Sequence, residues 1–183
     1  MVHKINFFII AAILVAFHPS KAVTGECHNK ITRVSGVFLN ARDTNVHLKD
    51  FTRTNLDNAK TYPWFKQTYQ DYNPDNHAVD SLTLLKKHVN IVVLGGSWCS
   101  DTRDLLPKFY KTAEMAKIPA ENIILIGVDH HKHSRDGRSR KYKIKRVPTF
   151  VLYYDGKEIG RVVESVNKSI ETDMLNVYHK AGY

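Results

Sequence analysis

The sequence predicts an α/β fold in which a central mixed sheet is flanked by helices and preceded by an N-terminal strand and helix extension. From Ala78 onward, stretches with helical periodicity alternate with short apolar runs typical of buried strands. Two of these runs, 91–94 and 123–128, are separated by a single predicted helix, which is the pattern of parallel strands joined by a crossover. Asp155 and Gly156 separate two further apolar runs and predict a tight antiparallel hairpin at one edge of the sheet.

Residues 1–22 have the pattern of a secretory signal peptide. A basic start at Lys4 is followed by an apolar run over 5–17, and small residues occupy positions Ser20 and Ala22. The apolar run is short for a membrane span. We therefore expect cleavage after Ala22, a secreted or periplasmic protein, and no stable membrane span in the mature chain.

Residues 23–77 are predicted to form the N-terminal extension. A strand is expected over 32–39, and a helix over 63–72 with Pro63 in its first turn, where a proline fits without loss of a hydrogen bond. The aromatic residues of this helix fall on one face, which is typical of core packing. They are Phe65, Tyr69 and Tyr72.

Residues 78–183 are predicted to form the main domain, and its last helix is expected to begin at Ser169, which can cap it. The expected elements, in chain order, are a helix over 78–89, a strand over 91–94, a helix over 100–116, a strand over 123–128, a short helix over 140–145, strands over 149–154 and 158–163, and a helix over 169–178.

Cys99 lies at the junction between a predicted strand and a predicted helix. Gly95, Gly96 and Ser97 end the strand, and acidic residues in the next turn are typical of a helix start. Free backbone N–H groups and the positive end of the helix dipole favour a thiolate at this position, which lowers the thiol pKa and makes the residue reactive. The chain has one other cysteine, Cys27, and two cysteines in an oxidising compartment also suit a single disulfide.

Several motifs together resemble the thioredoxin superfamily. Trp98 and Cys99 follow an apolar strand and precede Thr102 by the family's spacing, Pro107 lies in the next helix, and residues 147–150 (Val-Pro-Thr-Phe) precede a hairpin. The resemblance covers roughly residues 78–178, and the region before it is similar to the extensions of exported bacterial thioredoxin-like proteins.

The resemblance implies roles for individual residues of this chain. Cys99 matches the attacking cysteine of the family, and Trp98 matches the aromatic residue that shields it. Pro148 matches the family's cis-proline, which leaves the backbone of Val147 free to pair with an extended substrate chain.

Two positions depart from the family pattern. Thr102 replaces the resolving cysteine, so the local second step of a dithiol reductase cannot occur, although the hydroxyl can donate a hydrogen bond to the Cys99 thiolate. Val93 replaces the usual buried acid. Asp101 lies nearer the sulfur and is a candidate acid or base, but it is better explained as a first-turn acid that stabilises the helix.

The sequence therefore predicts thiol–disulfide exchange on protein or small-thiol disulfides, with no tightly bound cofactor. Cys99 can act as a monothiol that a small external thiol of the glutathione type releases, or Cys27 can resolve it. The competing prediction is a non-catalytic binding or chaperone-like module on the same fold.

The formal charge of +9 is concentrated between Lys132 and Arg146. Aromatic residues are not regularly interleaved with these basic residues, so a solvated face, or steering of acidic partners to the site, is expected rather than nucleic-acid binding. The histidine-rich stretch 129–133 has the residue types of a metal site, but neighbouring cations disfavour one and no metal is expected. It is expected at the carboxyl end of its strand, on the same rim of the sheet as Cys99.

Overall fold

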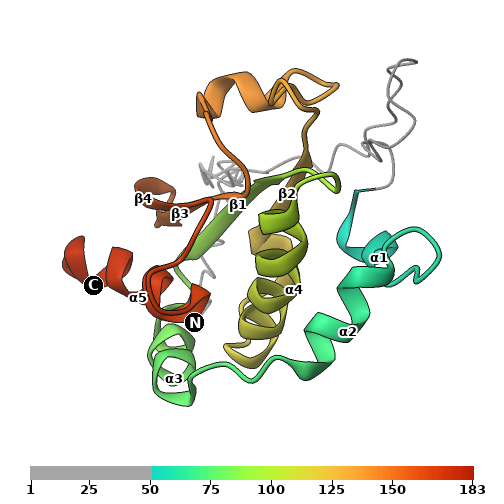
Figure 1. The fold of residues 1–183 in the computed structure, drawn as a ribbon. Helices are drawn as coiled ribbons and strands as arrows, with labels where there is room; N and C mark the ends of the chain where they lie inside the picture. The colour runs from blue at the N-terminus through green and yellow to red at the C-terminus, as the bar shows by residue number, and fades with distance from the viewer. Residues whose placement is uncertain (1–50) are drawn as a thin grey trace, which may run out of the picture. The chain divides into compact units, whose positions relative to one another are not determined.

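The structure, a computed structural model, describes residues 51–183 of the chain. The predicted signal peptide 1–22, the predicted strand 32–39 and Cys27 lie outside the described residues. Within 51–183 the elements follow the predicted order (Figure 1). The helices are α1 (Arg53–Leu56), α2 (Pro63–Asp71), α3 (Asn76–Leu85), α4 (Ser100–Met115) and α5 (Ile170–Lys180), with 3₁₀ helices η1 (Ala120–Asn122) and η2 (Arg138–Tyr142); the strands are β1 (Val89–Gly95), β2 (Ile123–Gly127), β3 (Thr149–Tyr154) and β4 (Lys157–Val163).

The sheet is mixed and has the strand order β2-β1-β3-β4. Strands β1 and β2 are parallel and are joined through α4, as the sequence predicts. Strand β3 runs antiparallel to β1, with Tyr154 opposite Val89 and Thr149 opposite Leu94, and β4 completes the predicted hairpin. Because β1 ends at the Thr149 end of β3, the residues that follow β1 and those that precede β3 meet at one end of the sheet.

Side chains of β1 alternate between two hydrophobic cores. Ile91 and Val93 enter the larger core, which contains the buried residues of α2, α3, α4 and α5. Val92 and Leu94 enter the smaller core on the other face, which the connection between β2 and β3 covers through residues such as Tyr142. This alternation is the two-residue period of a strand buried on both faces.

Local sequence signals explain several element ends. Helix α5 is capped by Ser169, whose hydroxyl accepts a hydrogen bond from Thr172 N, as predicted. Helix α2 begins at Pro63, also as predicted. The hairpin turn places Asp155 and Gly156 at positive φ (47° and 78°), the conformation that a two-residue turn of this type needs.

The described part of the extension packs into the larger core of the domain. Phe51, Leu56, Tyr62 and Phe65 are all buried there. The four-residue helix α1 was not predicted, because it is too short to show a helical period and depends on its cap at Thr52. The described extension and domain therefore share one core.

Two other elements differ from expectation. The short helix expected over 140–145 is a 3₁₀ helix over Arg138–Tyr142, bounded by Gly137 and Lys143 at positive φ. Most residues of β2 are only half-buried, since β2 is an edge strand of the sheet formed by the described residues. Among residues 51–183 no helix combines the length and hydrophobicity required to span a bilayer.

Candidate active site

Cys99 is the N-cap residue of α4, directly after the turn that ends β1. Its N–H donates to Gly96 O at 3.0 Å, and its carbonyl accepts the first helical hydrogen bond from Arg103 N at 3.0 Å. The Sγ atom is part of a free thiol on a half-buried residue. The N–H groups at positions 100–102 precede the first helical hydrogen bond and point toward the end of the helix where the sulfur lies.

The indole of Trp98 is held on the connection between β2 and β3. Its Nε1 donates to Val128 O at 2.9 Å, and its ring stacks on His130 with centroids 4.1 Å apart. Lys132 Nζ lies 5.8 Å from the indole centroid. Trp98 therefore joins the thiol-bearing turn to the histidine-rich stretch. This contact agrees with the prediction that the histidine-rich stretch lies on the same rim of the sheet as Cys99.

Val147 and Pro148 approach the thiol from the start of β3. Cys99 Sγ donates to Val147 O at 3.3 Å, and the peptide bond between Val147 and Pro148 is cis, in agreement with the resemblance. Within residues 51–183, no group accepts a hydrogen bond from Val147 N–H. The sulfur thus lies beside a stretch of backbone that retains a donor for an incoming chain.

Thr102 lies one helical turn after Cys99 and is completely buried. Its Oγ1 accepts a weak hydrogen bond from Gly96 N at 3.4 Å, and no hydrogen bond joins it to Cys99 among the described residues. The reason is that its side chain turns under the backbone of Gly95, where an added Cβ would lie 2.9 Å from Thr102 Cγ2 and 3.6 Å from Phe51 Cε1. The expected hydrogen bond from Thr102 to the sulfur is therefore replaced by one to the backbone.

The remaining predicted groups lie as follows. Asp101 is half-buried in the first turn of α4 and forms no hydrogen bond or ion pair with another described residue. Val93 is fully buried opposite Leu125 of β2, so this position supplies no carboxylate beneath the thiol. Arg103 Nε donates to Ser97 O at 2.5 Å and braces the turn before the cysteine.

The histidine-rich stretch holds its residues apart from a common centre. His130 faces Trp98, whereas the rings of His131 and His133 are 6.4 Å apart. The Asp129 carboxylate accepts from His133 N at 2.8 Å and so stabilises the turn. Within residues 51–183 no three histidine, cysteine or acidic side chains are grouped as metal ligands.

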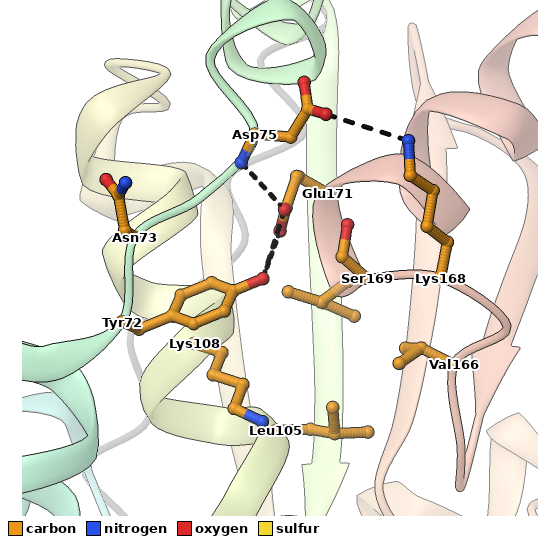
Figure 2. Close-up of a pocket in the computed structure, with 10 residues that line it drawn as sticks. Tyr72, Asn73, Asp75, Leu105, Lys108, Val166, Lys168, Ser169 and Glu171 are labelled. Atoms are coloured by element: carbon orange, nitrogen blue, oxygen red, sulfur yellow. Dashed lines mark hydrogen bonds and ion pairs between the residues drawn. The ribbon is translucent and has the colours of Figure 1, made fainter.

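A second polar cluster lies in a cleft of about 370 Å³ between the α2–α3 linker, α4 and the start of α5 (Figure 2). Glu171 is 1% exposed, and its carboxylate accepts from Tyr72 OH (2.8 Å), Asp75 N (3.0 Å) and Thr112 Oγ1 (3.2 Å). Burial alone would raise the pKa of Glu171, but hydrogen bonds from Asp75 N–H, Ser169 and Tyr72 outweigh it and lower the pKa.

The hydrogen bond between Tyr72 and Glu171 shifts the pKa of Tyr72 in the opposite direction. Burial, together with the hydrogen bond to the Glu171 carboxylate and its negative charge, raises the pKa of the Tyr72 phenol. The carboxylate therefore remains ionised and ties three segments of the chain together.

Sequence reasoning missed three of these features. The stacking of His130 on Trp98 was not predicted, although their common rim was. Phe51 carries no motif, and the pairing of Tyr72 with Glu171 joins residues 99 positions apart, for which a single sequence contains no local signal.

Comparison with known proteins identifies relatives. The family model of thioredoxin matches residues 73–176. A thioredoxin from Chlamydia pneumoniae is 30% identical over 79 residues, which are 43% of this chain and 72% of that protein. A thioredoxin from Coprinus comatus is 30% identical over 96 residues, covering 51% of this chain and 87% of the relative.

Among solved structures, a protein of unknown function from Pseudomonas aeruginosa superposes with a TM-score of 0.52. It is 16% identical, and the match covers 68% of this chain and 87% of that one. This similarity supports the fold.

Proposed function

The chain belongs to the thioredoxin family, whose activity is thiol–disulfide exchange, and we propose that it performs this exchange with Cys99 as a single nucleophilic thiol. The observation that carries the proposal is the position of Sγ, at the N-terminus of α4 and 3.3 Å from Val147 O. Thr102 occupies the place one turn later where a second thiol would stand.

In the first step, the Cys99 thiolate attacks one sulfur of a substrate disulfide. The substrate S–S bond breaks, a mixed disulfide with Cys99 forms, and the second substrate sulfur leaves as a thiolate that takes a proton from solvent. The first-turn N–H groups of α4 stabilise the attacking thiolate. Trp98 shields the sulfur, and the Val147 backbone beside Pro148 positions the substrate chain.

In the second step, an external thiolate of the glutathione type attacks Cys99 Sγ. The substrate leaves as a thiolate, and Cys99 is left in a mixed disulfide with the small thiol. A second small thiol attacks this intermediate, releases the small disulfide and returns Cys99 to its reduced form. The net reaction converts one substrate disulfide and two small thiols into one substrate dithiol and one small disulfide, so no bound cofactor is required.

Cys27 offers a second route for resolution. Phe51 packs beside Gly95 and Thr102, and 23 residues (28–50) separate it from Cys27. Because an extended chain spans at most about 3.3–3.6 Å per residue, the number of intervening residues does not prevent Cys27 from reaching Cys99. The N-terminal sequence further supports a secreted or periplasmic location, where such a disulfide would persist.

The proposal is tested by restoring the dithiol motif with Thr102→Cys. The buried site accepts a side chain of similar size, so the variant should reduce insulin disulfides with dithiothreitol at least tenfold faster than the parent chain. Thr102→Val is the matched control, because it keeps the shape without supplying a thiol. Cys27→Ser is included in every chain so that Cys27 does not contribute.

The parent Cys27→Ser chain should form a mixed disulfide at Cys99 with oxidised glutathione, detected by intact mass, and Cys99→Ser should not. If Thr102→Cys is inert and the parent chain forms no mixed disulfide, the exchange function is excluded. The non-catalytic binding module would then be the better account of the fold.

A further inference from the structure

The connection between β2 and β3 contacts the candidate site at both of its ends, through Trp98 and Cys99. Val128, at its start, accepts the hydrogen bond from Trp98, and Val147, at its end, accepts the one from Cys99. His130 stacks on Trp98 near the start of the connection. In Figure 1 this segment, drawn in orange, lies at the end of the sheet where α4 begins. A substrate bound at the thiol therefore lies close to the ends of this connection.

This connection carries most of the chain's excess positive charge. Residues 129–146, which we call the basic connection, contain eight lysine and arginine residues and two acidic residues, a net charge of +6 out of +9 for the whole chain. Its basic residues are Lys132, Arg135, Arg138, Arg140, Lys141, Lys143, Lys145 and Arg146.

Only part of this charge is neutralised within the described structure. Asp136 is held by the side chains of Arg138 and Ser134, and Arg146 pairs with Glu164 at 2.6 Å. Three further basic residues are exposed, and their side chains have no carboxylate partner within residues 51–183. They are Arg140, Lys143 and Lys145.

The basic connection is held in a defined conformation. Ser134 and Ser139 exchange two backbone-to-hydroxyl hydrogen bonds of 2.8 and 2.9 Å. Tyr142 is buried in the smaller core, and its carbonyl accepts from Arg161 Nη1 at 2.6 Å. The cations are thus presented from a supported backbone, which reduces the conformational entropy lost when an anion binds.

We propose that the basic connection is a docking surface for an acidic polypeptide segment that flanks the disulfide of the protein substrate. The proposal rests on the proposed exchange function of Cys99, and it specifies the class of substrate: a protein whose disulfide lies beside a run of aspartate or glutamate. Carboxylates of that run lie over the cations while the adjoining chain lies along Val147. Attraction over this patch raises the encounter rate of such substrates with the thiol.

The structure favours a polypeptide over the two other polyanions that a basic surface can bind. Single-stranded nucleic acid needs open aromatic faces for base stacking, but Tyr142 is buried and Trp98 is covered by His130 and Lys132. An anionic membrane favours exposed apolar side chains beside the cations, and the exposed large hydrophobic residues described in 51–183 lie outside 129–146.

The test compares two disulfide probes that differ only in flanking charge. Each is a short peptide whose cysteine carries a 5-thio-2-nitrobenzoate group, flanked either by glutamates or by glutamines. Attack by Cys99 forms a disulfide with the peptide and releases the coloured thiolate, so one turnover is measured directly. At about 20 mM salt the acidic probe should react roughly tenfold faster than the neutral one, and at about 0.5 M salt the difference should vanish.

A matched pair of variants locates the effect. The first combines Arg140→Gln, Lys143→Gln and Lys145→Gln, and should lose most of the preference for the acidic probe. The second removes the same amount of positive charge from exposed residues at the opposite end of the sheet. These residues lie near the start of β1, in the hairpin and at the end of α5. This variant should keep the preference for the acidic probe. Its substitutions are Lys87→Gln, Lys157→Gln and Lys180→Gln.

Failure of this proposal is distinguishable from failure of the exchange function. The neutral probe reports whether Cys99 reacts, whereas binding of a fluorescein-labelled glutamate peptide to the full chain with Cys99→Ser reports docking without chemistry. Equal binding of the glutamate and glutamine peptides, or equal loss of preference in both variants, would overturn the proposal. Tighter binding of a single-stranded oligonucleotide of equal charge, or of phosphatidylserine vesicles, would overturn it in favour of that ligand.

Discussion

Replacing Glu171 with glutamine removes the negative charge from the most deeply buried carboxylate in residues 51–183 while preserving the shape of the side chain. Three donors from different segments converge on this group: Tyr72 OH, Asp75 N–H and Thr112 OH (Figure 2 draws the first two). We expect the substitution to destabilise the fold and to leave the chemistry of Cys99 intact.

The size of the effect follows from the contacts. A hydrogen bond to a charged group contributes about 1.5–3 kcal/mol, and a neutral one about 0.5–1.5 kcal/mol. Glutamine retains one acceptor oxygen but places an amide donor against at least one of the three existing donors. The expected loss in free energy of unfolding is therefore about 2–4 kcal/mol. Tyr72→Phe, which removes a single donor, should cost less, about 1–2 kcal/mol.

The loss should depend on pH with a definite sign. The pKa of Glu171 is lower in the folded chain than its ordinary value of 4.5, so its ionised form stabilises the fold above that ordinary value. This stabilisation is lost as the pH falls through the folded pKa. The difference in stability between the parent chain and Glu171→Gln should therefore be constant near neutral pH and shrink below about pH 4.5.

Urea denaturation followed by far-ultraviolet circular dichroism at several pH values measures this difference directly. Glu121→Gln, at an exposed position in η1, is the control and should change the free energy of unfolding by less than about 0.5 kcal/mol. A Glu171→Gln chain as stable as the parent at pH 7, or a difference that grows on acidification, would refute the assigned role of the carboxylate.

Two further predictions concern the candidate site. In Gly96→Ala the new Cβ would lie 2.3 Å from Trp98 Nε1, so the indole must leave Val128 O. Alkylation of Cys99 by iodoacetamide should then become several-fold faster, as it should in Trp98→Ala. Rates equal to that of the parent chain in both variants would show that the indole does not shield the thiol. Non-reducing peptide mapping of the chain purified under oxidising conditions should find a disulfide between Cys27 and Cys99 in part of the population, and two free thiols would exclude resolution by Cys27.

Features with a local physical cause could be read from the sequence. The apolar runs of β1 and β2, the Asp155–Gly156 turn and the Ser169 cap each depend on a few neighbouring residues whose conformational preferences are strong. The position of Cys99 between a strand and a helix followed from the same reasoning. Family resemblance added Pro148, because that residue lies far from Cys99 in sequence and no local pattern joins them.

Features that depend on which segments meet were decided only by the tertiary structure. Thr102 could have faced the sulfur or the backbone, and the packing of its side chain beneath Gly95 decided between the two. Glu171 resembles any acid in the first turn of a helix until Tyr72 and Asp75 are seen to donate to it. The physical reason is that hydrogen bonds and packing between distant segments depend on atomic positions that only the assembled sheet and helices define, whereas period, caps and turns are properties of a few consecutive residues.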